Sequence, residues 1–187
     1  MIAGAETSAV FVTPRPWHLP GKLRYGAADT YRLAADWLQT CPTVADWGGG
    51  TGFFRPFLPN SVRYTRVDGT QQPDRMARAL TGNDVQVLAD LTTYREPSDG
   101  ILLRHVLDNT DEWQPILANA LTAFRQRLVV VTYTPAATMT TVVRHEHGWP
   151  VRHFDHEDLI GAMGSLLVRF AFVPTSHPER VYYLERR

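Results

Sequence analysis

The apolar residues of this chain change their spacing several times, and each change predicts an element of secondary structure. Short apolar runs, typical of strands buried in a sheet, are predicted at residues 44–47, 62–67, 85–88, 100–103 and 128–133. Helical spacing separates or follows them, at residues 27–38, 73–80, 116–124 and 155–163. Asp111 is the predicted cap of the third of these helices, and Asp155 that of the fourth.

The order of these elements predicts the fold class. Strands that alternate with helices form parallel sheets, because each crossover lays its helix against a face of the sheet. The run at residues 128–133 is apolar throughout, as expected of a strand buried on both faces. Two further runs, at 166–173 and 180–184, are joined by a connection too short for a parallel crossover. We therefore predict a doubly wound α/β fold that ends in an antiparallel hairpin.

Two segments lack this regular pattern. Residues 1–20 are predicted to be an irregular N-terminal segment, and residues 21–187 are predicted to form a single domain. After Pro135 the pattern lapses for about twenty residues. A loop of that length inside a compact domain either has a function or contains a small element. Residues 135–154 are therefore a candidate lid.

The composition narrows the class of protein further. A chain of 187 residues, 44% of them hydrophobic, has the size of one domain with a sizeable core. It contains neither an apolar run of about 20 residues nor a secretory signal, so we expect a cytoplasmic protein with no membrane partner. Cys41 is the single cysteine, which excludes an intramolecular disulfide. The formal net charge of +0 provides no overall attraction to nucleic acid.

The most specific feature is a glycine cluster after the first predicted strand, in the sequence VADWGGGTG at residues 44–52. Glycine permits a tight turn and a close approach of backbone to ligand, and this first turn binds nucleotide-like ligands in doubly wound sheets. The Gly-x-Gly-x-x-Gly spacing of dinucleotide-binding proteins is absent, because Phe53 and Arg55 occupy the positions that need glycine. A phosphate-binding P-loop is excluded, because the cluster has no lysine. The spacing is Gly-x-Gly-x-Gly, preceded by Asp46.

This Asp-x-Gly-x-Gly-x-Gly pattern resembles motif I of the class I S-adenosylmethionine-dependent methyltransferases. The resemblance covers the chain from about Tyr25 to its C-terminus. It implies a Rossmann-like three-layer sandwich with a mostly parallel seven-stranded sheet, in which the terminal hairpin supplies the sixth and seventh strands. It also implies S-adenosylmethionine as the cofactor. The candidate cofactor-binding residues are Asp46, Gly48, Gly49, Gly50, Gly52, Asp68, Asp90, Leu91 and Tyr25.

The resemblance assigns a role to each of these positions. The glycines line the methionine moiety and the ribose, and Asp46 holds the methionine ammonium directly or through water. Asp68 binds the ribose hydroxyls, a role that suits a carboxylate because it accepts a hydrogen bond from each hydroxyl of a diol. Asp90 contacts the adenine amine, or caps a turn instead, and Leu91 packs on the adenine ring. Tyr25 either covers the cofactor or packs against the sheet.

The candidate catalytic residues are His105 and Asp108, which follow the fourth predicted strand in the segment expected to face the methyl group. His105 is either a general base or a histidine packed at a strand end. Asp108 either orients His105 or caps the next helix, and of these two roles we expect capping. This segment does not have the Asn/Asp-Pro-Pro-Tyr/Phe motif of enzymes that methylate the exocyclic amines of bases.

Residues 144–156 hold four histidines and two acids, so this region is either a metal site or a lid over the acceptor. The histidine spacing matches no zinc motif, and we expect a lid and no metal. Arg144 and Trp149 are the candidate acceptor-binding residues.

From these features we expect methyl transfer to an oxygen or nitrogen atom of a small molecule or glycan. The alternatives are methylation of nucleic acid or protein through a local arginine patch, and a non-catalytic S-adenosylmethionine-binding subunit.

Overall fold

The computed structural model describes residues 28–69, 85–133, 139–144, 150–174 and 178–186. The α-helices in these ranges are α1 (Ala28–Leu38), α3 (Trp113–Ala123) and α4 (His156–Met163). The 3₁₀ turns are η2 (Arg55–Phe57), η3 (Leu107–Asn109) and η4 (Gly164–Leu166). The strands are β1 (Thr43–Trp47), β2 (Arg63–Asp68), β3 (Val85–Leu88), β4 (Ser98–Arg104), β5 (Phe124–Tyr133), β6 (Thr141–Arg144), β7 (Pro150–His153), β8 (Leu167–Val173) and β9 (Glu179–Glu185).

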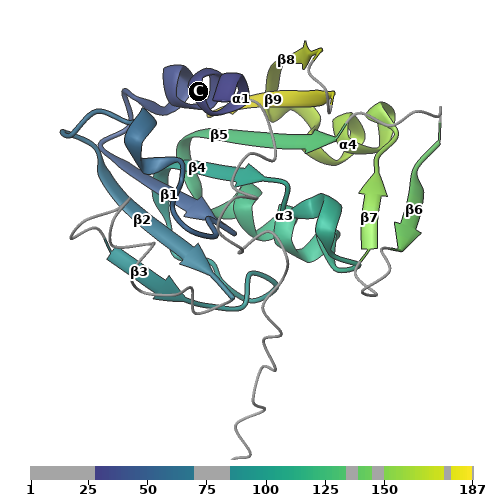
Figure 1. The fold of residues 1–187 in the computed structure, drawn as a ribbon, viewed down its shortest axis with the longest axis horizontal. Coiled ribbons are helices and arrows are strands. Elements are labelled where there is room, and N and C mark those ends of the chain that lie inside the picture. Colours follow the sequence, from purple (N-terminus) through teal and green to yellow (C-terminus); the bar gives the residue numbers. More distant parts are fainter. Residues whose placement is uncertain (1–27, 70–84, 134–138, 145–149, 175–177, 187) are drawn as a thin grey trace, which may run out of the picture.

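The main sheet has seven strands in the order β3-β2-β1-β4-β5-β9-β8 (Figure 1). The strands from β3 to β5 are parallel, and β9 runs antiparallel to both of its neighbours, β5 and β8. The chain builds outward from β1 to β3 and then returns to β4, so the order reverses between β1 and β4. This arrangement confirms the predicted mixed α/β sheet and its terminal antiparallel hairpin.

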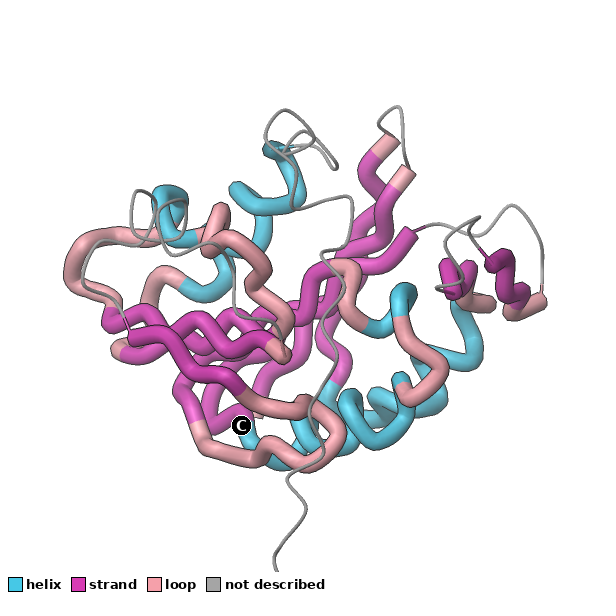
Figure 2. Tube along the Cα trace, turned by 60° about the horizontal axis from the view of Figure 1, so that its bottom comes forward, coloured by secondary structure: helices cyan, strands magenta, loops and turns pink. Residues whose placement is uncertain are grey.

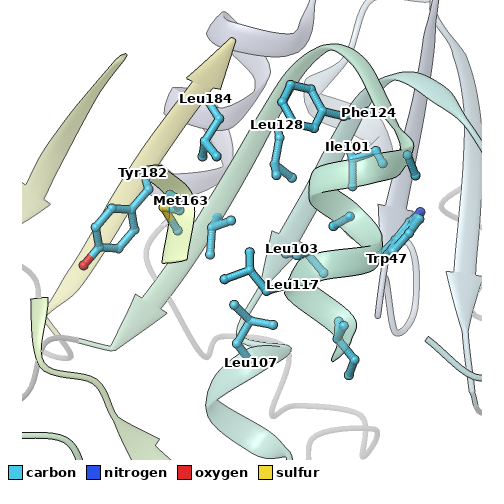
Figure 3. Packing of buried hydrophobic residues seen from close by; sticks show 14 of the residues in the cluster. Trp47, Ile101, Leu103, Leu107, Leu117, Phe124, Leu128, Met163, Tyr182 and Leu184 are labelled. Atoms are coloured by element: carbon cyan, nitrogen blue, oxygen red, sulfur yellow. The ribbon is translucent and has the colours of Figure 1, made fainter. Parts of the chain in front are cut away.

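Helices cover both faces of the sheet and create two hydrophobic cores (Figure 2). Because successive side chains of a strand point to opposite faces, Leu102 of β4 lies in the core beneath α1, and Leu103 lies in the core beneath α3 and α4. Both side chains are fully buried. Figure 3 shows the second core, where Leu117 of α3 and Met163 of α4 gather with residues of the strands.

The sequence predicted an N-terminal cap for two helices, and the structure confirms one of them. Asp155 caps α4 as predicted, because its Oδ1 accepts a hydrogen bond of 3.0 Å from the backbone N–H of Glu157. The prediction that Asp111 caps α3 is wrong. The helix begins at Trp113 after Glu112, which has no side-chain capping bond. Asp111 instead forms an ion pair of 3.2 Å with Arg144.

The region 135–154 is not a structureless loop in the part that the structure describes. β6 and β7 form a separate two-stranded antiparallel sheet. Arg152 of β7 fastens this hairpin to the loop before α3, because its guanidinium donates to the backbone oxygen of Thr110 and lies 3.5 Å from a carboxylate oxygen of Asp111. The small element that the length of this segment allowed is therefore a hairpin.

Some predictions fall outside the described residues. These are the irregular segment at 1–20, the helix at 73–80 and the turn of the terminal hairpin at 175–177. None of the described helices combines the length and the apolar character needed to cross a membrane.

Candidate functional site

Two segments meet where the strand order reverses, at the carboxyl ends of β1 and β4. In open α/β sheets, ligands bind in the crevice at this point. The glycine cluster follows β1, and residues 105–109 follow β4. The two segments are in contact, because a Cβ added to Gly48 would lie 2.4 Å from Cγ2 of Val106. The candidate site therefore includes a turn in which the backbone of Gly48 packs tightly against the side chain of Val106.

The backbone of the glycine cluster explains its composition. Gly48, Gly50 and Gly52 have φ angles of 72°, 52° and 76°, a region that other residues rarely adopt. Gly49 is needed for a different reason, because a Cβ there would lie 2.8 Å from Oδ2 of Asp46. Around Gly50, by contrast, an added Cβ would meet no atom of the described residues within 4 Å. The cluster thus forms a tight turn with open space on the side of Gly50.

Asp46 lies beneath this turn with its side chain buried. The hydroxyl of Tyr64 donates a hydrogen bond of 2.7 Å to its Oδ2. Burial raises the pKa of Asp46 to about 6, with a further contribution from the nearby charge of Asp68, although the Tyr64 hydrogen bond opposes this rise. A buried carboxylate at this turn is suited to bind a cation, because a positive charge stabilises its ionised form.

Asp68, at the end of β2, reaches the same turn from the neighbouring strand. Its Oδ2 accepts a hydrogen bond of 2.8 Å from the backbone N–H of Gly50. Arg66, two residues earlier on the same face of β2, donates to the backbone oxygen of Gly50 and to Oε1 of Gln86. β2 therefore holds both the N–H and the C=O of one glycine, which fixes the glycine loop against the carboxylate predicted to bind the ribose.

The predicted adenine contacts lie after β3. Oδ1 of Asp90 accepts hydrogen bonds from the backbone N–H and from the hydroxyl of Thr92, at 2.9 and 2.8 Å. Asp90 thus does stabilise a turn, the alternative considered from the sequence, and its contact with adenine stays a prediction. Leu91 is buried, in the core on the α3 side of the sheet. Its packing on the adenine ring also stays a prediction.

His105 and Asp108 are brought together, although not in the expected way. Nδ1 of His105 lies 2.8 Å from Oδ2 of Asp108, and the same oxygen accepts a hydrogen bond of 3.0 Å from the backbone N–H of Tyr133. Asp108 lies in η3, five residues before α3 begins, so the expected helix capping is wrong and the orientation of His105 is what the structure shows. Nε2 of His105 contacts Oε1 of Glu179, the first residue of β9. Both ring nitrogens are therefore engaged by carboxylates.

The sequence did not indicate several residues of this site. Tyr64 and Arg66 share a strand face with Asp68, and this spacing of two residues was a usable signal. Glu179 had no such signal, because it lies 74 residues from His105 and meets it only through the order of the strands. Tyr133 stacks on the His105 ring, with 4.0 Å between the ring centroids.

The remaining predicted residues lie elsewhere or outside the described ranges. Arg144 is at the end of β6, with a mostly exposed side chain paired to Asp111, and its contact with an acceptor stays a prediction. Tyr25 and Trp149 lie outside the described residues, as do His145 and His147 of the histidine-rich segment. Among the side chains that the structure describes, no three of His, Cys, Asp and Glu are arranged to hold a metal ion.

No protein-family model and no curated protein matches this chain. Solved structures do. A 1,6-didemethyltoxoflavin-N1-methyltransferase from Burkholderia thailandensis superposes with a TM-score of 0.69 at 19% identity, over 83% of this chain and 77% of that one. The chain has the fold of the class I methyltransferases. The magnesium protoporphyrin IX methyltransferase from Synechocystis gives a TM-score of 0.67 at 14% identity, over 85% of this chain and 83% of that one.

A third structure with the methyltransferase fold is an N-methyltransferase from Bradyrhizobium japonicum, with a TM-score of 0.65 at 14% identity over 89% of this chain and 91% of that one. All three of these proteins were crystallised with S-adenosylhomocysteine bound. At these identities the likeness establishes the fold, and the function has to be argued from the site.

Proposed function

We propose that this protein is an S-adenosylmethionine-dependent methyltransferase that acts on an oxygen or nitrogen atom of a small-molecule or glycan acceptor. The observation that carries the proposal is the glycine loop, with three positive φ angles, lying between two carboxylates at the reversal point of the sheet. Solved structures of the same fold that contain S-adenosylhomocysteine support the choice of cofactor.

The residues present suit the parts of this cofactor. A Cβ added to Gly50 would meet no described atom within 4 Å, so the ligand can approach the backbone closely there, and the buried Asp46 offers a negative charge for the ammonium. Asp68 already accepts one backbone N–H through Oδ2, and its carboxylate lies at the loop where the ribose diol would bind. The bound cofactor would supply an electrophilic methyl group on sulfur, so the protein mainly has to align and shield the reactants.

The engagement of His105 bears on the type of acceptor. In this arrangement its ring has no lone pair available for a substrate proton, because both nitrogens contact carboxylates. A neutral amine, an aromatic ring nitrogen or a carboxylate has a lone pair for attack without a protein base, whereas an alcohol needs one. The geometry therefore favours acceptors of the first kind.

The test is calorimetric titration with S-adenosylmethionine and S-adenosylhomocysteine. We expect micromolar binding by the wild type and binding at least about tenfold weaker by Asp68→Ala, because a charged hydrogen bond to the ribose contributes about 1.5–3 kcal/mol. Asp36→Ala, which removes an exposed carboxylate from α1, is the matched control and should bind as the wild type does. Folded, ligand-free protein that produces no heat with either compound would contradict the proposal.

Acceptor class is tested separately. If the acceptor were nucleic acid, retention of the protein on DNA or RNA would fall steeply with added salt, because binding releases counterions. Absence of such retention, together with methyl transfer to a small amine or carboxylic acid, is the expected result.

A further inference from the structure

Four ionisable side chains are buried together at the end of β4, where the sequence predicted the segment that faces the methyl group. They are Arg104, His105, Asp108 and Glu179, and we call them the His105 clamp. Their side chains are 8%, 10%, 0% and 0% exposed, respectively. Arg104 forms an ion pair of 2.7 Å with Oε1 of Glu179, and the same oxygen contacts Nε2 of His105. Asp108 holds the other ring nitrogen at 2.8 Å.

The position of Glu179 follows from the topology. β9 is antiparallel to β5, so its first residue lies at the edge of the sheet where the parallel strands end. Arg104 is the last residue of β4, and its guanidinium also lies 4.2 Å from the ring centre of Tyr31 in α1. The clamp therefore joins β4, β9, η3 and α1 at the edge of the sheet that carries the candidate site.

The contacts of the clamp match a His105 ring that carries a proton on each nitrogen. An ionised carboxylate only accepts hydrogen bonds, so a ring that bonds to two carboxylates must donate from both nitrogens. With His105 doubly protonated, the two positive charges of Arg104 and His105 balance the two negative charges of Asp108 and Glu179. Burial raises the pKa of Glu179, but the hydrogen bond from His105 and the charge of Arg104 outweigh it, and the resulting pKa is below its usual range. The stacked ring of Tyr133 also favours a cationic partner.

The backbone connects this clamp to the glycine loop. His105 has a φ of 53°, and it is the one residue other than glycine with a positive φ among those that the structure describes. Such a conformation is strained for a residue with a Cβ and persists where surrounding contacts enforce it. The next residue, Val106, is the one that packs against Gly48. A change in the backbone conformation of His105 would therefore move the neighbouring residue that packs against Gly48.

We propose that Glu179 is a positioning residue of the cofactor site, which acts by holding the protonated His105 ring so that Val106 supports the glycine loop. This role rests on the proposed function, because the loop is taken to bind S-adenosylmethionine. It also assigns His105 to support of the loop, in place of the general base that was one of the two roles considered from the sequence.

The first experiment is a nitrogen–proton correlation spectrum of the imidazole rings near neutral pH, with His105 assigned by comparison with His105→Gln. We expect both ring nitrogens of His105 to carry protons in the wild type, and one of them to lose its proton in Glu179→Gln. A wild-type spectrum with a single protonated nitrogen on His105 would overturn the proposal. That outcome can be read from the wild-type protein itself, with His105→Gln needed only for the assignment.

The second experiment compares S-adenosylhomocysteine affinities. We expect Glu179→Gln to bind about tenfold more weakly, and the loss to be smaller in a Val106→Ala background because the two residues act in series. Glu185→Gln is the matched control, since it removes a carboxylate that pairs with Arg127 at the other end of the same strand. It should bind as the wild type does.

The outcomes separate the two proposals. Wild-type binding with equal affinity in Glu179→Gln would overturn the positioning role and leave the methyltransferase proposal standing. A wild type that does not bind S-adenosylhomocysteine would remove the proposed function and the positioning role with it. Equal weakening by Glu179→Gln and Glu185→Gln would indicate a general loss of stability and would also overturn the positioning role.

Discussion

At the scale of the residue, the site illustrates how burial changes what a side chain can do. Asp46 was identified from the sequence as an acid before the glycines, and its chemistry depends on surroundings that the motif does not specify. Burial raises its pKa and the nearby charge of Asp68 adds to the rise, whereas the hydrogen bond from Tyr64 opposes it. The result is a carboxyl group that titrates at about pH 6 in the ligand-free protein.

This value predicts how cofactor affinity depends on pH. The ammonium of the ligand prefers an ionised Asp46, so affinity should be constant above about pH 6 and fall about tenfold per unit below it. Calorimetric titration with S-adenosylhomocysteine over this range is the measurement. Asp46→Asn should bind weakly with no such dependence, and a wild-type affinity that is unchanged below pH 6 would contradict the assignment of Asp46.

At the scale of the element, the site depends on the contact between two turns at the ends of β1 and β4. The glycine loop was predicted because its sequence pattern is local. Its contact with Val106 was not predicted, because β1 and β4 become neighbours only when the sheet forms. The hairpin β6–β7 was missed because its strands, TVVR and PVRH, mix one or two valines with polar residues and proline, so neither forms an apolar run.

The contact between the turns predicts different effects of alanine at two glycines. Gly48 and Gly50 both have positive φ angles, so alanine costs about 1–2 kcal/mol at either position. Only at Gly48 does the new Cβ also overlap Val106, so Gly48→Ala should lower the free energy of unfolding further than Gly50→Ala. Urea unfolding measures both.

A second background provides the control for this comparison. In Val106→Ala the overlapping methyl group is absent, and the extra cost of Gly48→Ala should shrink while that of Gly50→Ala stays the same. Equal costs of Gly48→Ala and Gly50→Ala in the wild type would argue against the close contact.

At the scale of the whole molecule, one sheet separates two cores and both cores depend on it. Leu102 and Leu103 are adjacent in β4, and each lies fully buried in a different core. Because the strands are common to both layers, we expect the domain to unfold as a single cooperative unit.

Alanine at these two positions tests this expectation. Leu102→Ala and Leu103→Ala should each lower the free energy of unfolding by about 2–5 kcal/mol, since each leaves a cavity in a packed core. Within each variant, circular dichroism and tryptophan fluorescence should report the same unfolding midpoint as each other. Val142→Ala, at an exposed position of β6, should change stability by less than about 0.5 kcal/mol. Separate transitions for the two faces would show that the cores are independent.

The local features of this protein could be predicted from its amino-acid sequence. The period of the apolar residues defined most strands and helices, and the glycine spacing with Asp46 and Asp68 located the candidate cofactor site, because strand ends and tight turns depend on neighbouring residues. Which strand ends lie next to one another depends on the tertiary structure. The order β4-β5-β9 brings Glu179 to His105 across 74 residues and converts a candidate base into the centre of a charged clamp. No local pattern encodes that contact, because it depends on how distant strands share one sheet.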